Sequence, residues 1–249
     1  MIENKRLADY LAKLLKIHTF KDYSPNGLQV EGRSEIRKII TGVTASQALI
    51  DAAILQRADA ILVHHGYFWK NESPVLLGHQ RQRIASLLKN NINLYAYHLP
   101  LDMHPTLGNN QQLGLILGVQ SIQPASNKDS VFSGVLPEAV QLDQWVAHCQ
   151  KRLNRDMLVV AAGTRSVLNV AWCTGGAQHY IDQAIKLGVD VYISGEISEQ
   201  TAHLARENNI HYIAAGHHAT ERYGIKALGQ HIAEQFSLPV QFIDINNPA

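Results

Sequence analysis

The chain contains two copies of one strand–helix–strand pattern, and this duplication limits its possible folds more than any other feature. Residues 40–63 resemble residues 170–194 at an offset of 131 positions (59 to 190). In each copy two apolar runs flank an amphipathic segment, which is typical of a βαβ unit. We therefore expect an α/β fold with two similar lobes built from duplicated βαβ units. The identical positions include Asp51 and Asp182, Ala53 and Ala184, and Asp59 and Asp190.

The expected lobe boundaries depend on one segment between the copies and on the C-terminal residues. Residues 121–130, with three serines, a proline and an asparagine, form the most linker-like stretch. We place the first lobe at 1–122 together with 215–249, and the second lobe at 123–214. The C-terminal residues are assigned to the first lobe because its histidines would have to meet His217 and Glu221. The second lobe is then an insertion.

Histidines and carboxylates follow three short apolar runs, at residues 60–63, 93–96 and 211–214. The carboxyl ends of strands are where an α/β sheet usually builds its site. Imidazole and carboxylate ligands suit a divalent transition metal, and this set exceeds what one ion needs. The sequence therefore predicts a two-metal centre. The candidate residues are His64, His65, His98, Asp102, His217 and Glu221.

Two of these runs lead into a histidine that stands four residues before a carboxylate. His217 and Glu221 would share one face of a helix that begins there. Pro100 separates His98 from Asp102, so we expect a tight turn rather than a helix at that point.

The third run ends in the adjacent pair His64 and His65, whose side chains would point to opposite faces of a regular strand. They can serve two neighbouring ions only if the strand ends there, and Gly66 permits such a turn. A single histidine at a strand end is more often a hydrogen-bonded structural residue than a ligand. The grouping with carboxylates favours the metal interpretation.

Composition excludes several classes of protein. Charged residues make up 17% of the chain and the net charge is +1, which argues against a sequence-independent nucleic-acid binder. Two cysteines without C-x-x-C spacing favour a reducing compartment over a disulfide framework. We find no signal-peptide pattern and no run approaching the ~20 apolar residues of a membrane span. A cytoplasmic protein without a membrane partner is expected.

Three further motifs allow a functional and a structural interpretation. Asn26 and Gln29 lie in a turn-like segment and could also touch a ligand. Residues 174–176 (Thr-Gly-Gly) resemble a small phosphate cradle, although a Gly-Gly pair after a strand is usually tight packing. The aromatic residues 67–69 could stack on a flat ring or cover the core. No nucleophile-elbow, Walker or dinucleotide-binding glycine motif occurs.

Four segments together resemble the GTP cyclohydrolase 1 type 2 homologues, also called Ngg-interacting-factor-three-like proteins, and most closely the bacterial members. They are residues 22–32, 63–69, 98–102 together with 108–110, and 215–221. The resemblance covers nearly the whole chain. It implies two interlocked α/β lobes, a homohexameric toroid with the sites facing its cavity, and two divalent metal ions per subunit.

The resemblance also implies how the ligands divide between the ions. His65, Asp102 and Glu221 would hold one ion. His64 and His217 would hold the other, with Glu221 bridging both. His98 stands outside this set of five and is our candidate catalytic residue, as a proton shuttle; an extra ligand or a support for Asp102 remain alternatives.

Five protein ligands for two ions leave open positions, which is typical of a catalytic site. We expect a metal-dependent hydrolase acting on a small nucleotide-like, phosphorylated or ring-amide substrate. The alternative is a non-catalytic metal carrier, sensor or scaffold. The sequence leaves open which ion is native, with zinc, manganese and iron as candidates.

Overall fold

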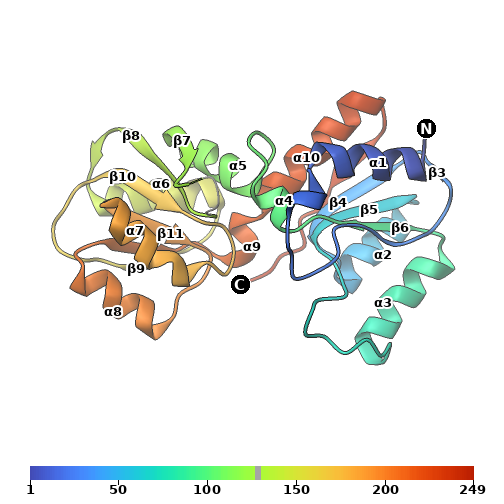
Figure 1. The fold of residues 1–249 in the computed structure, drawn as a ribbon, viewed down its shortest axis with the longest axis horizontal. Coiled ribbons are helices and arrows are strands. Elements are labelled where there is room, and N and C mark those ends of the chain that lie inside the picture. The colour runs from blue at the N-terminus through green and yellow to red at the C-terminus, as the bar shows by residue number, and fades with distance from the viewer. Residues whose placement is uncertain (127–129) are drawn as a thin grey trace. The chain divides into compact units, whose positions relative to one another are not determined.

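The computed structural model describes residues 1–126 and 130–249, which form two compact units (Figure 1). The first lobe consists of Met1–Gly108 and Gly224–Asn246. The second lobe consists of Asn109–Tyr223 and Asn247–Ala249 and is inserted in the first.

These bounds differ from the expected ones in three segments, because residues 109–122, 215–223 and 247–249 belong to the second lobe. Local hydrogen bonds explain the difference. The indole N–H of Trp172 donates to the Asn110 carbonyl (2.9 Å), and the Gly216 N–H donates to the Gly195 carbonyl (2.9 Å). Four of the ten residues of the expected linker (121–124) lie in a strand, since Gln120–Pro124 forms β7. Its residues 127–129 lie outside the described residues.

The first lobe is built on a five-stranded sheet in the order β13-β4-β5-β6-β2. The strands β4, β5, β6 and β13 are parallel, and β2 is antiparallel to β6. A two-stranded antiparallel sheet of β1 and β3 lies in the same lobe. The strand bounds are β1 Ile2–Glu3, β2 Gly27–Val30, β3 Glu35–Ile36, β4 Ile39–Thr44, β5 Ala60–His65, β6 Asn93–Ala96 and β13 Val240–Phe242.

Helices cover both faces of this sheet, as Figure 1 shows. Side chains of α1 and α10 pack with the strands in one apolar cluster, and those of α2 and α3 pack in another. The hydroxyl of Ser46 caps α2 by accepting the Leu49 N–H (3.3 Å). The helices and helical turns are α1 Asn4–Leu14, η1 Ile17–Thr19, α2 Gln47–Leu55, α3 Gly78–Lys89, α4 Leu99–Asp102 and α10 Arg222–Phe236.

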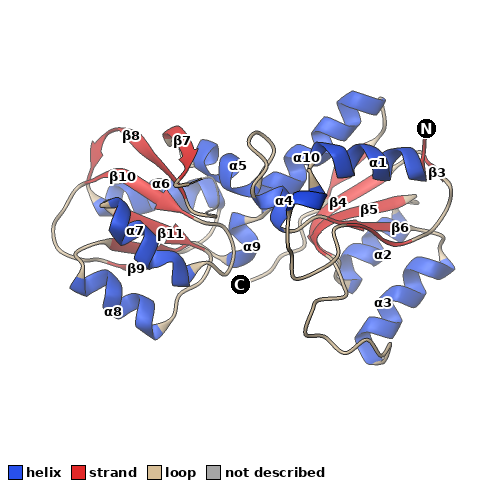
Figure 2. Cartoon of the chain, viewed as in Figure 1, coloured by secondary structure: helices blue, strands red, loops and turns tan. Residues whose placement is uncertain are grey.

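The second lobe is built on a six-stranded sheet in the order β7-β8-β10-β11-β12-β9. Figure 2 draws the strands of both lobes in red. In the six-stranded sheet only β10, β11 and β12 are parallel, and α7 and α8 contribute to one apolar cluster with them. The strands are β7, β8 Phe132–Val140, β9 Leu158–Val160, β10 Val167–Trp172, β11 Val191–Ser194 and β12 His211–Ala214. The helices and helical turns are α5 Asn109–Ile116, α6 Leu142–Leu153, η2 Gln178–Tyr180, α7 Ile181–Leu187, α8 Glu199–Glu207 and α9 His217–Thr220.

The predicted α/β fold with duplicated βαβ units is confirmed by the strand register. In β4 and β5, Ile39 lies opposite Ala60. In β10 and β11, Val170 lies opposite Val191, so the same offset of 131 relates both strands of the unit (39 to 170, 60 to 191). The repeat in the sequence is therefore a repeat in three dimensions.

The two repeated aspartates explain part of the sequence match. The Asp59 carboxylate accepts the N–H groups of Arg37 (2.6 Å) and Lys38 (3.0 Å), just before β4. The Asp190 carboxylate accepts those of Leu168 (3.0 Å) and Asn169 (2.8 Å) around the start of β10. Each aspartate thus satisfies backbone donors at the beginning of a parallel pair of strands.

Among the described helices, none combines the length and the apolar character needed to cross a membrane.

Candidate metal centre

His64 and His65 are the last two residues of β5, as the metal interpretation requires. Their ring centroids lie 4.5 Å apart. The chain leaves the strand at Gly66, where an added Cβ would lie 2.2 Å from Gln29 Oε1 and 2.5 Å from Ala96 Cβ. Only glycine fits this close approach, and the strand consequently ends with both imidazoles at the same edge of the sheet.

The segment after β6 differs from the expected tight turn, because Leu99–Asp102 forms the short helix α4. Pro100 occupies its first turn, where the N–H that proline lacks would have no intrahelical partner. The N–H of Asp102 donates to the His98 carbonyl at 3.1 Å. Proline therefore begins this helix rather than preventing it.

Three imidazoles gather at this edge of the first lobe. Ligand nitrogens of His64, His65 and His98 lie within 4.8 Å of one another. The carboxylate of Asp102 joins them, with Oδ1 at 3.5 Å from His64 Nε2. His64 and Asp102 are buried. This lobe alone thus assembles four of the six residues that the sequence singled out.

Each of these rings contacts a neighbouring protein atom through Nδ1. His64 Nδ1 lies 2.9 Å from the Tyr97 carbonyl, and His65 Nδ1 lies 3.1 Å from Thr44 Oγ1. Because a carbonyl oxygen only accepts, the His64 Nδ1 carries a proton and the lone pair of the neutral ring is on Nε2. An imidazole held in this way is oriented for a metal.

His98 is held by the carboxylate of Asp22, with Oδ1 at 2.7 Å from Nδ1. The same carboxylate accepts from the Asn26 side chain (2.8 Å) and the Leu99 N–H (2.9 Å). Burial raises the pKa of Asp22, but the hydrogen bonds from His98 and Asn26 and the charge of His98 outweigh it and lower the pKa. Asp22 is therefore an anion that fixes the His98 ring.

In the second lobe, the short helix α9 begins with His217 and is followed directly by Glu221. His217 is the first residue of the helix, and its Nε2 lies 3.2 Å from Glu221 Oε2. Its Nδ1 lies 2.8 Å from Glu196 Oε1. Burial lowers the pKa of His217, but the hydrogen bonds and charges of Glu221 and Glu196 raise it to about 9. The structure thus has the predicted helix that begins at His217 and the predicted i, i+4 contact between His217 and Glu221.

The glycine pair at residues 175–176 lies beside this helix, where it allows close packing instead of forming a phosphate-binding loop. A Cβ added to Gly175 would lie 2.2 Å from Glu221 Oε1 and 3.2 Å from His217 Nε2, and the residue has φ +70°. Its N–H donates to Thr220 Oγ1 at 3.0 Å. Gly175 thus makes room for the Glu221 carboxylate.

Asn26 and Gln29 position other residues. The amide oxygen of Asn26 accepts the His98 N–H (2.8 Å). Gln29 accepts the Tyr67 N–H (2.7 Å) and donates to the Tyr67 carbonyl (3.1 Å). Tyr67 is buried and serves the core, whereas the Trp69 ring lies edge-on to His98 at 5.0 Å. In this aromatic segment Tyr67 therefore covers the core, and Trp69 lies beside the candidate site.

Sequence reasoning missed the residues that hold the rings: Asp22, Thr44 and Glu196. Glu196 had a signal, because it occupies the position of His65 in the second copy of the repeat. Asp22 and Thr44 lie in no shared pattern with the histidines that they contact.

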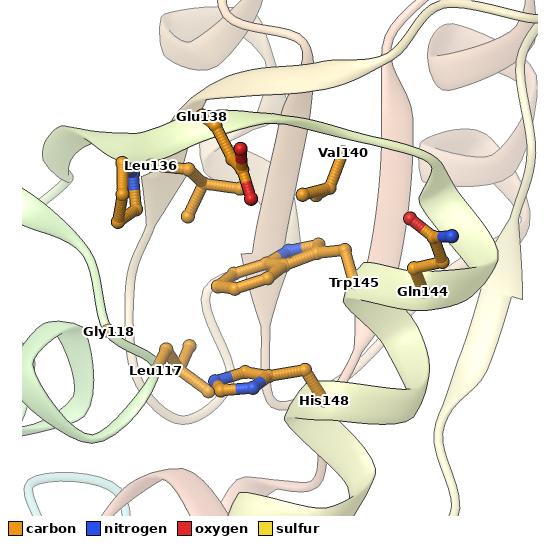
Figure 3. Close-up of a pocket in the computed structure, with 9 residues that line it drawn as sticks. Leu117, Gly118, Leu136, Glu138, Val140, Gln144, Trp145 and His148 are labelled. Atoms are coloured by element: carbon orange, nitrogen blue, oxygen red, sulfur yellow. The ribbon is translucent and has the colours of Figure 1, made fainter.

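An apolar hollow of about 290 Å³ lies elsewhere in the second lobe, between β8 and α6. Figure 3 shows the Trp145 indole and the His148 ring on one side of it and Leu136 on another. None of the candidate ligands lines it. This hollow is therefore not part of the candidate metal centre.

The family follows from a comparison with known proteins. A family model described as Duf34/NIF3 (NGG1p interacting factor 3) matches residues 2–248. The chain belongs to this family. The resemblance seen in the sequence is thereby confirmed.

Relatives match over the whole length. A protein of Yersinia pestis named "GTP cyclohydrolase 1 type 2 homolog" is 53% identical, with 100% of each chain covered. A protein of the same name from Pseudomonas aeruginosa is 52% identical, covering 98% of this chain and 97% of its own. A solved structure described as "Structural genomics, protein ybgI, unknown function" is 50% identical over 100% of both chains, with a TM-score of 0.96.

The donor set fits a transition metal by its chemistry. Imidazole nitrogens and carboxylate oxygens are the ligands that Zn²⁺, Mn²⁺ and Fe²⁺ accept in proteins. Considered separately, each lobe contains both kinds of donor: His64 with Asp102 in the first lobe, and His217 with Glu221 in the second. Groups that could bind a metal are therefore present.

Proposed function

We propose that the protein is a dinuclear metal-dependent hydrolase of a small nucleotide-like or otherwise phosphorylated substrate. The observation that carries the proposal is the orientation of four imidazoles. Each contacts a protein oxygen through Nδ1, two of them a carboxylate, at 2.7–3.1 Å. Contacts of this kind at Nδ1 orient metal-binding histidines so that Nε2 faces the ion.

The proposed ligands are five of the six candidate residues. As the family resemblance implies, His65, Asp102 and Glu221 would hold one ion, His64 and His217 would hold the other, and Glu221 would serve both. The ions are two divalent cations per subunit, drawn from zinc, manganese and iron.

Two bound ions supply a water of lowered pKa and neutralise charge on the attacked centre. The protein's own contribution is orientation and proton movement. His98 is the proposed catalytic residue, because Asp22 fixes its Nδ1 and thereby leaves proton exchange with the substrate to Nε2. The edge of Trp69 limits the positions of this ring.

A nucleotide-like substrate is favoured by two considerations. The relatives carry the name "GTP cyclohydrolase 1 type 2 homolog", which points to a nucleotide for those proteins. A dinuclear site suits phosphorylated groups because each cation can hold a substrate oxygen. Ring amides are attacked by the same chemistry and belong in the test.

Self-association to a toroidal homohexamer is part of the proposal and is supported by the family membership. The test is the mass in solution by light scattering. A mass of six times the 27.6 kDa subunit is expected. A monomer or dimer at all concentrations would contradict it.

The experiment on function is a substrate screen. Purified protein is loaded with Mn²⁺, Zn²⁺ or Fe²⁺ and incubated with nucleotides, phosphoesters and cyclic amides. Metal-dependent turnover should be abolished by chelation and restored by readdition. His98→Gln should lower the rate at least roughly 100-fold with an unchanged metal content. His203→Gln, on the exposed surface of α8, is the control.

The alternative is a metal carrier, sensor or scaffold without catalysis. It would be established by two ions per subunit in the wild-type protein and no turnover of any substrate in the screen. Activity in metal-free protein would contradict both the hydrolase and the role assigned to the histidines.

A further inference from the structure

A cluster of cationic side chains lies at the opposite end of the first-lobe sheet from His64 and His65. It borders a hollow of about 460 Å³ where β4 and β5 begin. Four cations and two carboxylates give this hollow a net charge of +2. The residues that line it are Arg33, Ser34, Glu35, Arg37, Lys38, Arg57 and Asp59.

Two of these residues have a structural role. The Arg33 guanidinium pairs with Asp59 at 2.7 Å and donates to the Asn90 and Asn91 carbonyls. The second lobe repeats the pair, with Arg165 Nε at 3.2 Å from Asp190. An arginine–aspartate pair at this end of the sheet therefore belongs to the repeated fold.

The other three cations have no such role. At the offset of 131, Arg37, Lys38 and Arg57 correspond to Leu168, Asn169 and Gly188. The backbone there is nevertheless the same. The Arg57 N–H donates to the Ile54 carbonyl (2.9 Å), and the Gly188 N–H donates to the Ile185 carbonyl (3.0 Å).

The hydrogen bonds to the repeated aspartates are also the same in both lobes. The N–H groups of residues 37 and 38 donate to Asp59, and those of residues 168 and 169 donate to Asp190. The second lobe shows that this structure forms without the three cations. Their presence in the first lobe needs another reason.

Arg57 is the most informative of the three, because its backbone is unfavourable for arginine. It has φ +53°, and Gly188 at the corresponding position has φ +67°. This left-handed region favours glycine and disfavours residues with a Cβ. The first lobe thus places an exposed arginine where the second lobe has the residue that the helix end prefers.

The interactions of these three side chains are loose. Arg37 pairs with Glu35 at 3.1 Å, with both side chains largely exposed (72% and 49%). Lys38 Nζ donates to Gln56 Oε1 at 3.0 Å. Within the described residues, the Arg57 guanidinium has no ion-pair partner. Such groups can exchange these contacts for a stronger anion without leaving a buried charge.

We propose that Arg37, Lys38 and Arg57 form a binding site for the polyphosphate group of a small ligand. Arginine forks match phosphate oxygens in a bidentate manner, and lysine adds a mobile point charge. A small ligand is favoured over nucleic acid because the cations line one hollow and the whole chain has a net charge of only +1.

This site is distinct from the candidate metal centre. Arg57 precedes β5, whereas His64 and His65 end it, and the ends of such a six-residue strand lie roughly 16 Å apart. The proposal therefore does not depend on the hydrolase assignment.

The test replaces the three cations by their own counterparts from the second lobe. Full-length protein is stripped of metal with EDTA, so that phosphate cannot bind through an ion, and titrated calorimetrically with tripolyphosphate. Arg37→Leu, Lys38→Asn and Arg57→Gly together should weaken binding at least tenfold. Arg57→Gly alone should weaken it several-fold, and it keeps the test informative if the triple variant folds poorly.

A variant with the same loss of three charges is the control. Lys151→Asn, Lys186→Asn and Arg206→Leu remove exposed cations from helices of the second lobe, and binding should change less than twofold. Titrations with GTP and ATP then show which part of a ligand is recognised. If both nucleotides bind with the affinity of tripolyphosphate, the site recognises the phosphates alone. If one nucleotide binds more tightly, its base also contacts the protein.

Three results would overturn the proposal. These are no binding of tripolyphosphate by the wild-type protein, an equal loss in the control variant, or tighter binding of duplex DNA than of tripolyphosphate at equal phosphate concentration.

Discussion

Asp22 Oδ1 lies 2.7 Å from His98 Nδ1, and this contact joins two segments that are 76 residues apart in the chain. The pair resembles the carboxylate–histidine arrangement that orients ligands and proton-transfer groups in metal sites. The histidine pattern alone did not reveal this arrangement, in which the His98 imidazole is held at Nδ1 and its Nε2 is left for proton exchange.

Replacing Asp22 by Asn tests this role. The amide keeps the shape but removes the charge that holds the His98 ring, so turnover of any substrate found in the screen should fall roughly tenfold to hundredfold. The metal content should stay at the wild-type value, because His98 is outside the proposed ligand set. Loss of an ion in Asp22→Asn would instead make His98 a ligand.

Gly175→Ala tests the close packing around Glu221. The new Cβ would meet Glu221 Oε1 at 2.2 Å on a backbone with φ +70°, so we expect a loss of about 2 kcal/mol in the free energy of unfolding. The matched control is Gly163→Ala, with φ +75° and no atom within 4 Å, which should cost about 1 kcal/mol. Urea unfolding measures both. Equal losses would show that Gly175 is needed only for its backbone.

The raised pKa of His217 predicts how the stability of metal-free protein depends on pH. The folded pKa is about 9 and the unfolded value is ~6.5, so the imidazolium stabilises the fold fully below pH ~6.5. This contribution is lost as the pH rises through 9. The melting temperature of EDTA-treated protein should therefore fall between these values, and the fall should be smaller in His217→Gln. Identical pH profiles for the two proteins would refute the assignment.

Much of the fold follows from the sequence because the repeat preserves both the strands and their register. The edge that carries His64 and His65 was predictable for the same reason, since apolar runs show where parallel strands end. The lobe boundary was not, because it depends on hydrogen bonds such as that from Trp172 to Asn110, which no local pattern encodes.

The sequence indicated the histidines and carboxylates that make up the candidate site, but it did not indicate the side chains that hold them. Pro100 was interpreted as a helix breaker, although the first turn of a helix accepts it. Asp22 and Thr44 come from loops and strand ends far from their histidines in sequence, so their roles appear only when the fold brings them together.

Elemental analysis of Glu221→Ala beside the wild-type protein tests the central claim most directly. The claim is that His64, His65, Asp102, His217 and Glu221 hold two ions and that Glu221 bridges them. The wild type should bind two ions per subunit and Glu221→Ala at most one, because the bridging carboxylate serves both ions and reduces their repulsion. Glu199→Ala, an exposed carboxylate on α8, should bind two. Two tightly bound ions in Glu221→Ala would contradict the account.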